Sequence, residues 1–348
     1  MRIEAIELTN FRRYEKALFE VSPQGLAWVG PNASGKTTLL EAIHKVAILK
    51  GFGREEEMLR WGASWYRVRL RLSEGLAEMS YERGKGTQLI WNGSPVSPLS
   101  QWLGRLPIVS LRPADVEWIE SGAEARRRWS NKILSQLSPE YFAALYAYQR
   151  ATDQRNALLA QGNVSPVLLE PWEAQMIRYG TLIQTKRLAL VEALQPALQT
   201  FYSQFGSEKV KLEYRLTCEP SAEGWHHRWR TLHAQEQQKA RTLLGPHRED
   251  FALYLQGKLA RTHASEGQKK SLLIALKWAE AQHLQQLTLR GILLLLDDIG
   301  EKLDRMRLSA VGQLSRLAMQ TFLTDVEERR VRDAFPELPI HFLEPPEG

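Results

Sequence analysis

The octapeptide GPNASGKT at residues 30–37 restricts the possible folds of this chain more than any other segment. It matches G-x-x-x-x-G-K-[ST], the phosphate-binding P-loop. An apolar run at residues 26–29 precedes it, and apolar residues recur at helical spacing over residues 39–47. A strand, a glycine-rich loop and a helix in this order direct backbone N–H groups and a helix N-terminus at a bound phosphate. Since both flanks fit, the sequence favours a nucleotide site over a chance glycine-rich turn.

The P-loop pattern predicts roles for individual side chains. Lys36 brings a full positive charge close to the β- and γ-phosphates, so we expect it to act in catalysis as well as in binding, and the Thr37 hydroxyl is placed to ligate Mg²⁺. ATP and Mg²⁺ are therefore the expected cofactors. The residues of this segment expected to contact the nucleotide are Gly30, Pro31, Asn32, Ala33, Ser34, Gly35, Lys36, Thr37 and Thr38.

The composition of the 348-residue chain excludes several other classes of protein. A single cysteine, Cys218, rules out an intrachain disulfide framework and a multi-cysteine zinc site. No apolar run approaches the length of a membrane span and the N-terminus has no signal-peptide core, so we expect a cytoplasmic protein without a membrane partner. The net charge of +6 favours a polyanionic partner without proving one.

One expected antiparallel β region, residues 65–97, carries a row of cations. Apolar residues at 66, 68, 70 and 72 alternate with Arg67, Arg69 and Arg71, so one face is apolar and the other basic. We expect these arginines to form a solvated outer face, with a track for DNA as the alternative.

A second nucleotide-site element follows much later in the chain. The apolar run at residues 292–296 has the character of a buried parallel strand and ends in Asp297 and Asp298, the Walker B pattern. We expect Asp297 to be a Mg²⁺ ligand, and Asp298 to be a catalytic residue that orients or deprotonates the attacking water. The long separation from Lys36 argues against a small kinase or GTPase and favours the ABC-type ATPases, in which a helical region interrupts the core.

ABC-type ATPases have a third element, a signature loop that begins a helix and faces the nucleotide of a second copy. Residues 264–268 (ASEGQ) fit this description, since Ser265 and Gln268 have the spacing of a capping box. We expect Ser265, Gly267 and Gln268 to contact the nucleotide held by the partner, and Asp304, in the D-loop position, to contact the opposite copy.

Two other elements of transporter ATPases are missing. Residues 324–325 (TD) stand where a switch histidine is usual, and no Q-loop glutamine is found near residues 111–113 (LRP).

The predicted fold class is therefore α/β, an ABC-type P-loop ATPase head of mixed sheets and helices that is interrupted by a mostly helical lobe. The head comprises residues 1–114 plus 240–348, and the inserted lobe residues 115–239. Within the lobe, serine and proline at 138–139 begin one long helix and a second covers about 168–205, so we expect an antiparallel helical hairpin.

The ordered motifs resemble those of the RecF family of bacterial recombination and repair ATPases, which are related to SMC heads. The resemblance runs nearly end to end, and the signature, Walker B and D-loop elements follow in the family's order. The other matching segments are NFRRY at 10–14, TLLEAI at 38–43, RRR at 126–128, the stretch 141–148, QRNALL at 154–159 and GPHRED at 245–250.

The resemblance implies an ATP-dependent homodimer, with ATP sandwiched between two copies, that closes on single- and double-stranded DNA at gaps or junctions. RecF-type proteins act with RecO and RecR to help RecA replace single-strand-binding protein in gap repair, replication restart and SOS induction. The family also implies that Arg12 lies near the adenine or the phosphates. ATP hydrolysis, slow and stimulated by DNA, would serve as the switch that reopens the dimer.

Four positions depart from the family pattern: Ala33 replaces glycine, Asn131 aspartate, Glu266 a neutral residue and Gly300 a bulkier one. They leave open the hydrolysis rate and the tightness of the dimer, so a catalytically weak adaptor that binds DNA or RecR remains an alternative. A transporter subunit is opposed by the missing switch histidine and by the lobe. An SMC-type protein would need a longer coiled coil, and a small-molecule kinase fits neither the spacing nor the signature loop.

Overall fold

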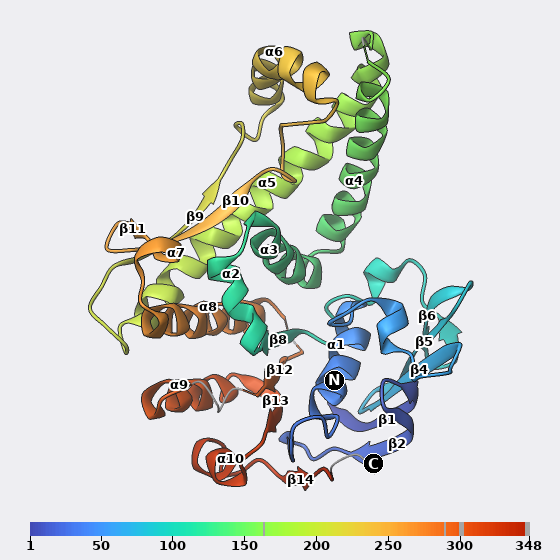
Figure 1. The fold of residues 1–348 in the computed structure, drawn as a ribbon, viewed down its shortest axis with the longest axis vertical. Helices are drawn as coiled ribbons and strands as arrows, with labels where there is room; N and C mark the ends of the chain where they lie inside the picture. The colour runs from blue at the N-terminus through green and yellow to red at the C-terminus, as the bar shows by residue number, and fades with distance from the viewer. Residues whose placement is uncertain (163, 289, 299–302, 345–348) are drawn as a thin grey trace. The chain divides into compact units, whose positions relative to one another are not determined.

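The computed structural model describes residues 1–162, 164–288, 290–298 and 303–344. The chain forms two compact units (Figure 1). The first, here called the head unit, comprises Met1–Val116 and Lys270–Gly348, and the second, the lobe unit, comprises Glu117–Lys269. Because the head unit contains both ends of the chain and is interrupted between Val116 and Lys270, the lobe unit is an insertion in the head unit.

A parallel sheet with the strand order β14-β3-β13-β12-β8 forms the centre of the head unit. Its strands are β3 (Gly25–Val29), β8 (Ile108–Leu111), β12 (Ile292–Asp297), β13 (Ala318–Asp325) and β14 (Ile340–Phe342). Helix α1 (Lys36–Ile48) packs against it through residues 39, 40, 43, 46 and 47, which are fully buried. Since β13 lies between β3 and β12, the P-loop and Asp297 emerge at the same edge of the sheet.

An antiparallel sheet with the order β2-β1-β4-β5-β6-β7 completes the head core. Its apolar face follows the predicted alternation, since residues 66, 68, 70 and 72 are buried. The strands are β1 (Ile3–Phe11), β2 (Tyr14–Glu20), β4 (Trp65–Leu72), β5 (Gly75–Glu82), β6 (Gly86–Trp91) and β7 (Ser94–Pro95).

The remaining helices of the head unit are short. Among the described residues, three are 3-10 helices: Glu55–Met58, Leu99–Gln101 and Pro113–Val116. The α-helices are α9 (Arg305–Ser315) and α10 (Glu328–Ala334).

The lobe unit contains the predicted helical hairpin. Helix α4 (Pro139–Leu159) is capped by the Ser138 hydroxyl, which accepts from the Tyr141 N–H, and it packs along α5 (Pro166–Tyr202) (Figure 1). The other lobe helices are α2 (Glu117–Glu120), α3 (Ala123–Leu137), α6 (Ala222–Lys239) and α7 (Ala260–His263). Helix α8 (Glu266–Leu287) crosses the second boundary between the units.

A small sheet with the order β11-β10-β9 was not predicted and moves the second boundary of the lobe from residue 239 to Lys269. Its strands are β9 (Val210–Arg215), β10 (Asp250–Leu255) and β11 (Lys258–Leu259). Residues 240–269 therefore belong to the lobe and not to the head, because β10 is hydrogen-bonded to β9 along its whole length. Over the part of the chain that the structure describes, no helix is both long and apolar enough to cross a membrane.

Candidate nucleotide-binding site

The P-loop makes a tight turn between β3 and α1. Gly35 has φ of +91°, the left-handed conformation that glycine adopts without strain, and a side chain there would meet Tyr14. Ala33 also has positive φ, +66°, so the position where the family has glycine requires a conformation that alanine adopts at a cost of about 1 kcal/mol. The Lys36 ammonium lies back over the loop and donates to the carbonyl oxygens of Gly30 and Pro31, both at 2.8 Å.

The two Walker elements meet although 260 residues separate them. The Thr37 hydroxyl donates to Asp297 Oδ1 at 2.8 Å, and the Thr324 hydroxyl donates to the same oxygen at 2.7 Å. Parallel pairing of β12 with β13 places Thr324 directly beside Asp297. Thr324 therefore holds the Asp297 carboxylate in place. The sequence did not predict this role, because a histidine is the residue expected at this position in transporter ATPases.

Asp298 turns away from the sheet immediately after β12. Its backbone φ is +45°, and its N–H donates to the carbonyl and the hydroxyl oxygens of Thr324 at 3.1 and 3.0 Å. The turn places Asp298 in the wall of a cavity of about 320 Å³ in front of the P-loop. The residues that line this cavity are Arg12, Arg13, Asn32, Ala33, Gly35, Lys36, Thr37, Thr38 and Asp298.

The segment NFRRY supports the P-loop from β1 and β2. Arg13 donates to the carbonyl oxygen of Ala33 at 2.8 Å, and the Tyr14 hydroxyl donates to that of Gly35 at 3.3 Å. Burial raises the pKa of Tyr14 to about 12, so its hydroxyl remains a donor at neutral pH. The sequence singled out this segment only through its family resemblance, and the contacts supply its physical role.

Arg12 is fixed at the cavity by a carboxylate from α1. It donates to both oxygens of Glu41, at 2.8 and 3.0 Å, and Glu41 also accepts from the Phe52 N–H at 2.8 Å. The hydrogen bond to Glu41 raises the pKa of Arg12, despite partial burial. Arg12 thus lines the cavity in front of the P-loop, and Glu41 is a residue that sequence reasoning missed.

The chemistry of this cavity fits a nucleoside triphosphate with a hard cation. Arg12, Arg13 and Lys36 supply positive charge, and Ser34 Oγ is buried with no hydrogen-bond partner among the described residues. Thr37 and Asp297 offer oxygen atoms, which Mg²⁺ prefers. Within the described residues no group of three or more His, Cys, Asp or Glu side chains could hold a metal, and a Mg²⁺ bound mainly by phosphates and water does not require one.

Comparison with known proteins identifies the family of this chain. Residues 1–57 match the family model described as an AAA ATPase domain. A curated protein of Moorella thermoacetica, named DNA replication and repair protein RecF, is 33% identical over 341 residues, which cover 94% of this chain and 90% of that protein. This chain belongs to the RecF family.

Solved structures support the same conclusion. The structure of the recombination mediator protein RecF with ATP in the RecFOR pathway superposes with a TM-score of 0.85 at 27% identity, covering 94% of each chain. An Smc head bound to the C-winged helix domain of ScpA superposes with a TM-score of 0.54 at 14% identity, covering 95% of this chain and 91% of that one, and shows a shared fold. The chain is thus a RecF-family protein with the ABC-type head fold that the sequence predicted.

The predicted signature loop of this RecF-family chain begins α8 with the expected capping box. The Ser265 N–H donates to Gln268 Oε1 at 2.9 Å, and the Gln268 N–H donates to Ser265 Oγ at 3.2 Å. Glu266, one of the departures from the family pattern, is ion-paired with Lys269 at 2.8 Å. Ser265 is exposed. Ser265, Gly267 and Gln268 belong to the lobe unit, whereas the P-loop belongs to the head unit.

Asp304, the predicted D-loop residue, is exposed and caps α9, because its carboxylate accepts from the Arg307 N–H at 2.9 Å. That hydrogen bond lowers the pKa of Asp304. Gly300, another departure, and the neighbouring residues 301–302 lie outside the described residues. At the expected switch position, Asp325 is buried and ion-paired with Arg330 at 3.2 Å, so its carboxylate is already engaged within the head unit.

Two of the three arginines in the row on β4 are paired with carboxylates. Arg69 lies between Glu7 and Glu78, and Arg71 lies beside Glu4, at 3.8 Å, and Glu20. Cations already paired with carboxylates on neighbouring strands add little net attraction for a phosphate backbone. The solvated-face interpretation therefore fits the structure better than a DNA track.

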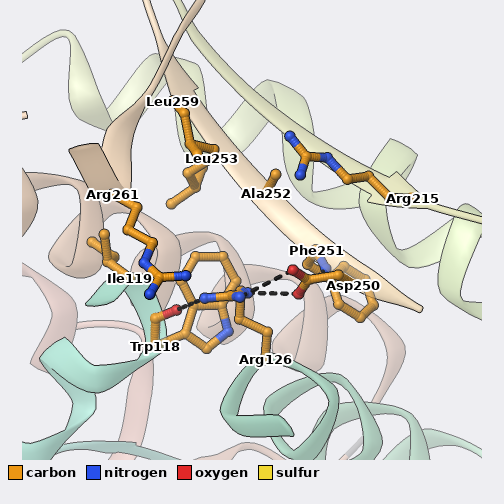
Figure 2. A pocket seen from close by; sticks show the side chains of 10 residues that line it. All are labelled: Trp118, Ile119, Arg126, Arg215, Asp250, Phe251, Ala252, Leu253, Leu259 and Arg261. Carbon is orange, nitrogen blue, oxygen red and sulfur yellow. Dashed lines mark hydrogen bonds and ion pairs between the residues drawn. The ribbon is translucent and has the colours of Figure 1, made fainter. Parts of the chain in front are cut away.

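The GPHRED segment of the family is part of the architecture of the lobe. Asp250 forms a two-pronged ion pair with Arg126, at 2.7 and 3.0 Å, which ties β10 to α3 (Figure 2). The adjoining cavity measures about 70 Å³, too small for a nucleotide. Glu249, buried, accepts from Gln184, Thr217 and Tyr214.

A second buried cluster explains the departure at Asn131. Its side-chain oxygen accepts from the Tyr141 hydroxyl at 2.7 Å and from Arg187 at 3.0 Å, and Arg187 also donates to the Pro246 carbonyl oxygen. Asn131 therefore acts in the packing of the lobe.

Proposed function

We propose that this chain is an ATP-dependent DNA-binding protein of the RecF type, which dimerises on ATP and acts with RecR and RecO at gaps or junctions in single- and double-stranded DNA. In that role it would help to load RecA in repair, replication restart and the SOS response. Support comes from its family, from a solved RecF structure with ATP, and from the net charge of +6. The observation that carries the proposal is the Thr37–Asp297 contact, which joins the two Walker elements beside a cationic cavity.

Each site residue has a role in this proposal. Lys36 and Arg12 neutralise charge on the nucleotide. Thr37 and Asp297 would hold Mg²⁺, which when bound neutralises the phosphate oxygens further. Asp298, fixed through its backbone N–H by Thr324, would orient or deprotonate the attacking water.

The proposed dimer completes the site with residues of the other copy. Ser265 is exposed at the N-terminus of α8, where backbone N–H groups and the helix dipole favour a phosphate. Gly267 and Gln268 would lie on the same nucleotide, and Asp304 would contact the opposite copy. The Glu266–Lys269 ion pair reduces the repulsion that an extra acid at this position would exert on the γ-phosphate.

A catalytically weak adaptor is the second candidate. It is favoured by the acid at position 266 and by the engagement of Asp325 with Arg330, which leaves the usual switch position without a side chain directed at the nucleotide. Measuring ATP turnover with and without DNA separates the two candidates, since an ATPase switch should show turnover that rises with DNA.

The dimer is tested by light scattering with and without ATP and Mg²⁺. The mass of the wild type should double with ATP, and Lys36→Ala should remain monomeric because the phosphates lose their main neutraliser. A Lys36→Ala protein that dimerises normally with ATP would contradict the sandwich arrangement.

The role of Asp298 is tested separately. Asp298→Asn should bind ATP normally but stay dimeric, with turnover reduced at least about 100-fold, because the water is no longer activated. Unchanged turnover would remove Asp298 from catalysis.

A further inference from the structure

Helix α6 of the lobe has one face that is fully engaged in packing. Trp225 is buried, and its ring lies where a side chain at Gly180 or Gly245 would be, at 2.4 and 2.5 Å from the added carbon. Its indole N–H donates to Gln184 at 3.0 Å. One turn further on, Trp229 lies 5.1 Å from the guanidinium of Arg155. Close packing on small residues therefore attaches this face of the helix to the rest of the lobe.

The same face is closed at its other end by a buried ion pair. Glu236 is fully buried and accepts from Arg155 at 2.7 Å and from the Leu243 N–H at 2.6 Å. Trp225, Trp229 and Glu236 lie within about 40° of one another around the helix axis. On the remaining circumference of α6, Gln237 adds one hydrogen bond, to the carbonyl oxygen of Val164 at 3.2 Å.

That remaining circumference is cationic. His227 and Arg230 lie opposite Trp225, and His226 and Arg228 lie on the two flanks; all four are exposed. The exposed basic residues of α6 and the turn after it are His226, His227, Arg228, Arg230, His233, Lys239 and Arg241. The one exposed acid in the helix is Glu223, in its first turn.

The charges on α6 are available, unlike those of Arg69 and Arg71 on β4. Every residue of α6 is described, and Arg228, Arg230 and Lys239 have no carboxylate within 4.0 Å among the described residues. On β4, by contrast, Arg69 and Arg71 each contact two carboxylates. Cations without carboxylate partners on a firmly packed helix are expected of a surface that binds a polyanion.

The other exposed side chains of α6 favour a nucleic acid backbone over an acidic protein. Gln235 and Gln238 are exposed and can donate hydrogen bonds to phosphate oxygens. None of the large exposed apolar residues of the described chain lies on α6, whereas protein interfaces depend on such anchors. At 18 residues the helix is about 27 Å long, enough to follow several phosphates.

We infer that the outward face of α6, here called the α6 cationic face (Arg228 and Arg230 with His226, His227 and His233), binds the phosphate backbone of DNA. The inference rests on the proposed DNA-binding function and assigns its contact surface. Phosphate contacts of this kind carry no sequence information, so the surface would hold DNA of any sequence.

The test compares two double variants that remove the same charge. Arg228→Gln with Arg230→Gln alters the α6 cationic face, and Lys16→Ala with Arg83→Ala removes two exposed cations of the head unit that have no ion-pair partner within the described residues. The binding of a gapped DNA duplex is measured with ATP from about 50 to 200 mM salt. The α6 variant should lose about 10- to 30-fold in affinity at 0.15 M salt, and its salt slope should fall by about 2, since each phosphate contact adds about 0.9.

The outcomes separate the inference from the function on which it rests. Wild-type affinity and salt slope in the α6 variant, with the wild type binding DNA, would overturn the inference and leave the proposed function standing. If the wild type itself fails to bind DNA, the proposed function fails and the inference with it. An equal loss in the control variant would show that only the overall charge matters, and would also overturn the assignment. Unchanged thermal unfolding and ATP-dependent mass verify that the α6 variant is folded.

Discussion

The Arg12–Glu41 pair gives the sharpest test of how the nucleotide cavity is built. The Glu41 side chain is only 3% exposed, so its carboxylate depends on the two Arg12 donors and the Phe52 N–H. Removing one partner of a fully buried pair costs about 3–5 kcal/mol. Because Arg12 is 31% exposed, solvent takes over part of its role, and we expect Arg12→Ala to cost about 2–3 kcal/mol of unfolding free energy.

Hydrogen exchange of the α1 amides measures this cost without assuming that both units unfold together. The matched control is Arg60→Ala, since Arg60 pairs with Glu15 at 3.0 Å on the surface and should contribute less than about 0.5 kcal/mol. A double-mutant cycle with Glu41→Ala should give a coupling of about 2 kcal/mol. Equal costs for Arg12→Ala and Arg60→Ala, or a coupling near zero, would refute the argument from burial.

Two further predictions concern the lobe. Burial lowers the pKa of His247 to about 4, against 6.5 for an exposed histidine. The unfolded chain therefore binds a proton at a higher pH than the folded protein does. The free energy of unfolding is highest above pH 6.5 and decreases as the pH falls toward 4. Thermal unfolding should show a loss of about 2 kcal/mol between pH 7 and pH 5 that His247→Asn removes; an unchanged pH dependence in the variant would contradict it. Gly180→Ala should lower the free energy of unfolding by about 2–3 kcal/mol, because the added methyl group would overlap Trp225. The control Gly122→Ala should lower it little, because its methyl group meets no atom within 4 Å. Thermal unfolding followed by circular dichroism compares the two variants, and equal losses would refute the overlap.

Local patterns predicted the individual sequence motifs well. The P-loop, the strand ending in Asp297 and the cap at Ser265 each depend on residues close together in the sequence, and each has its predicted local structure. The meeting of Thr37 with Asp297 was also predictable, because strands of a parallel sheet present their carboxyl ends at one edge. The role of Thr324 was not, since it depends on which strand lies between β3 and β12.

The lobe was predicted less completely, for a physical reason. Strand β9 is short, and α6 separates it in the sequence from its partner β10, so periodicity alone gave no sign of the pairing. The ion pair of Arg126 with Asp250 joins residues 124 positions apart. Long-range polar contacts of this kind leave no local pattern, and the boundary near residue 239 was misplaced because it relied on helical periodicity.

The interior of the lobe has a consequence for genetics. Arg155, Arg187, Glu236 and Glu249 are each at most 2% exposed and are held by hydrogen bonds and ion pairs rather than by hydrocarbon packing. Removing one donor from such a network leaves a buried charge without a partner. This lowers the stability of the fold more than the loss of a buried methyl group does. For inactive variants altered in GPHRED or at Arg187, the abundance of the protein should therefore be measured first. Only a variant of normal abundance can be interpreted as having lost a contact with a partner.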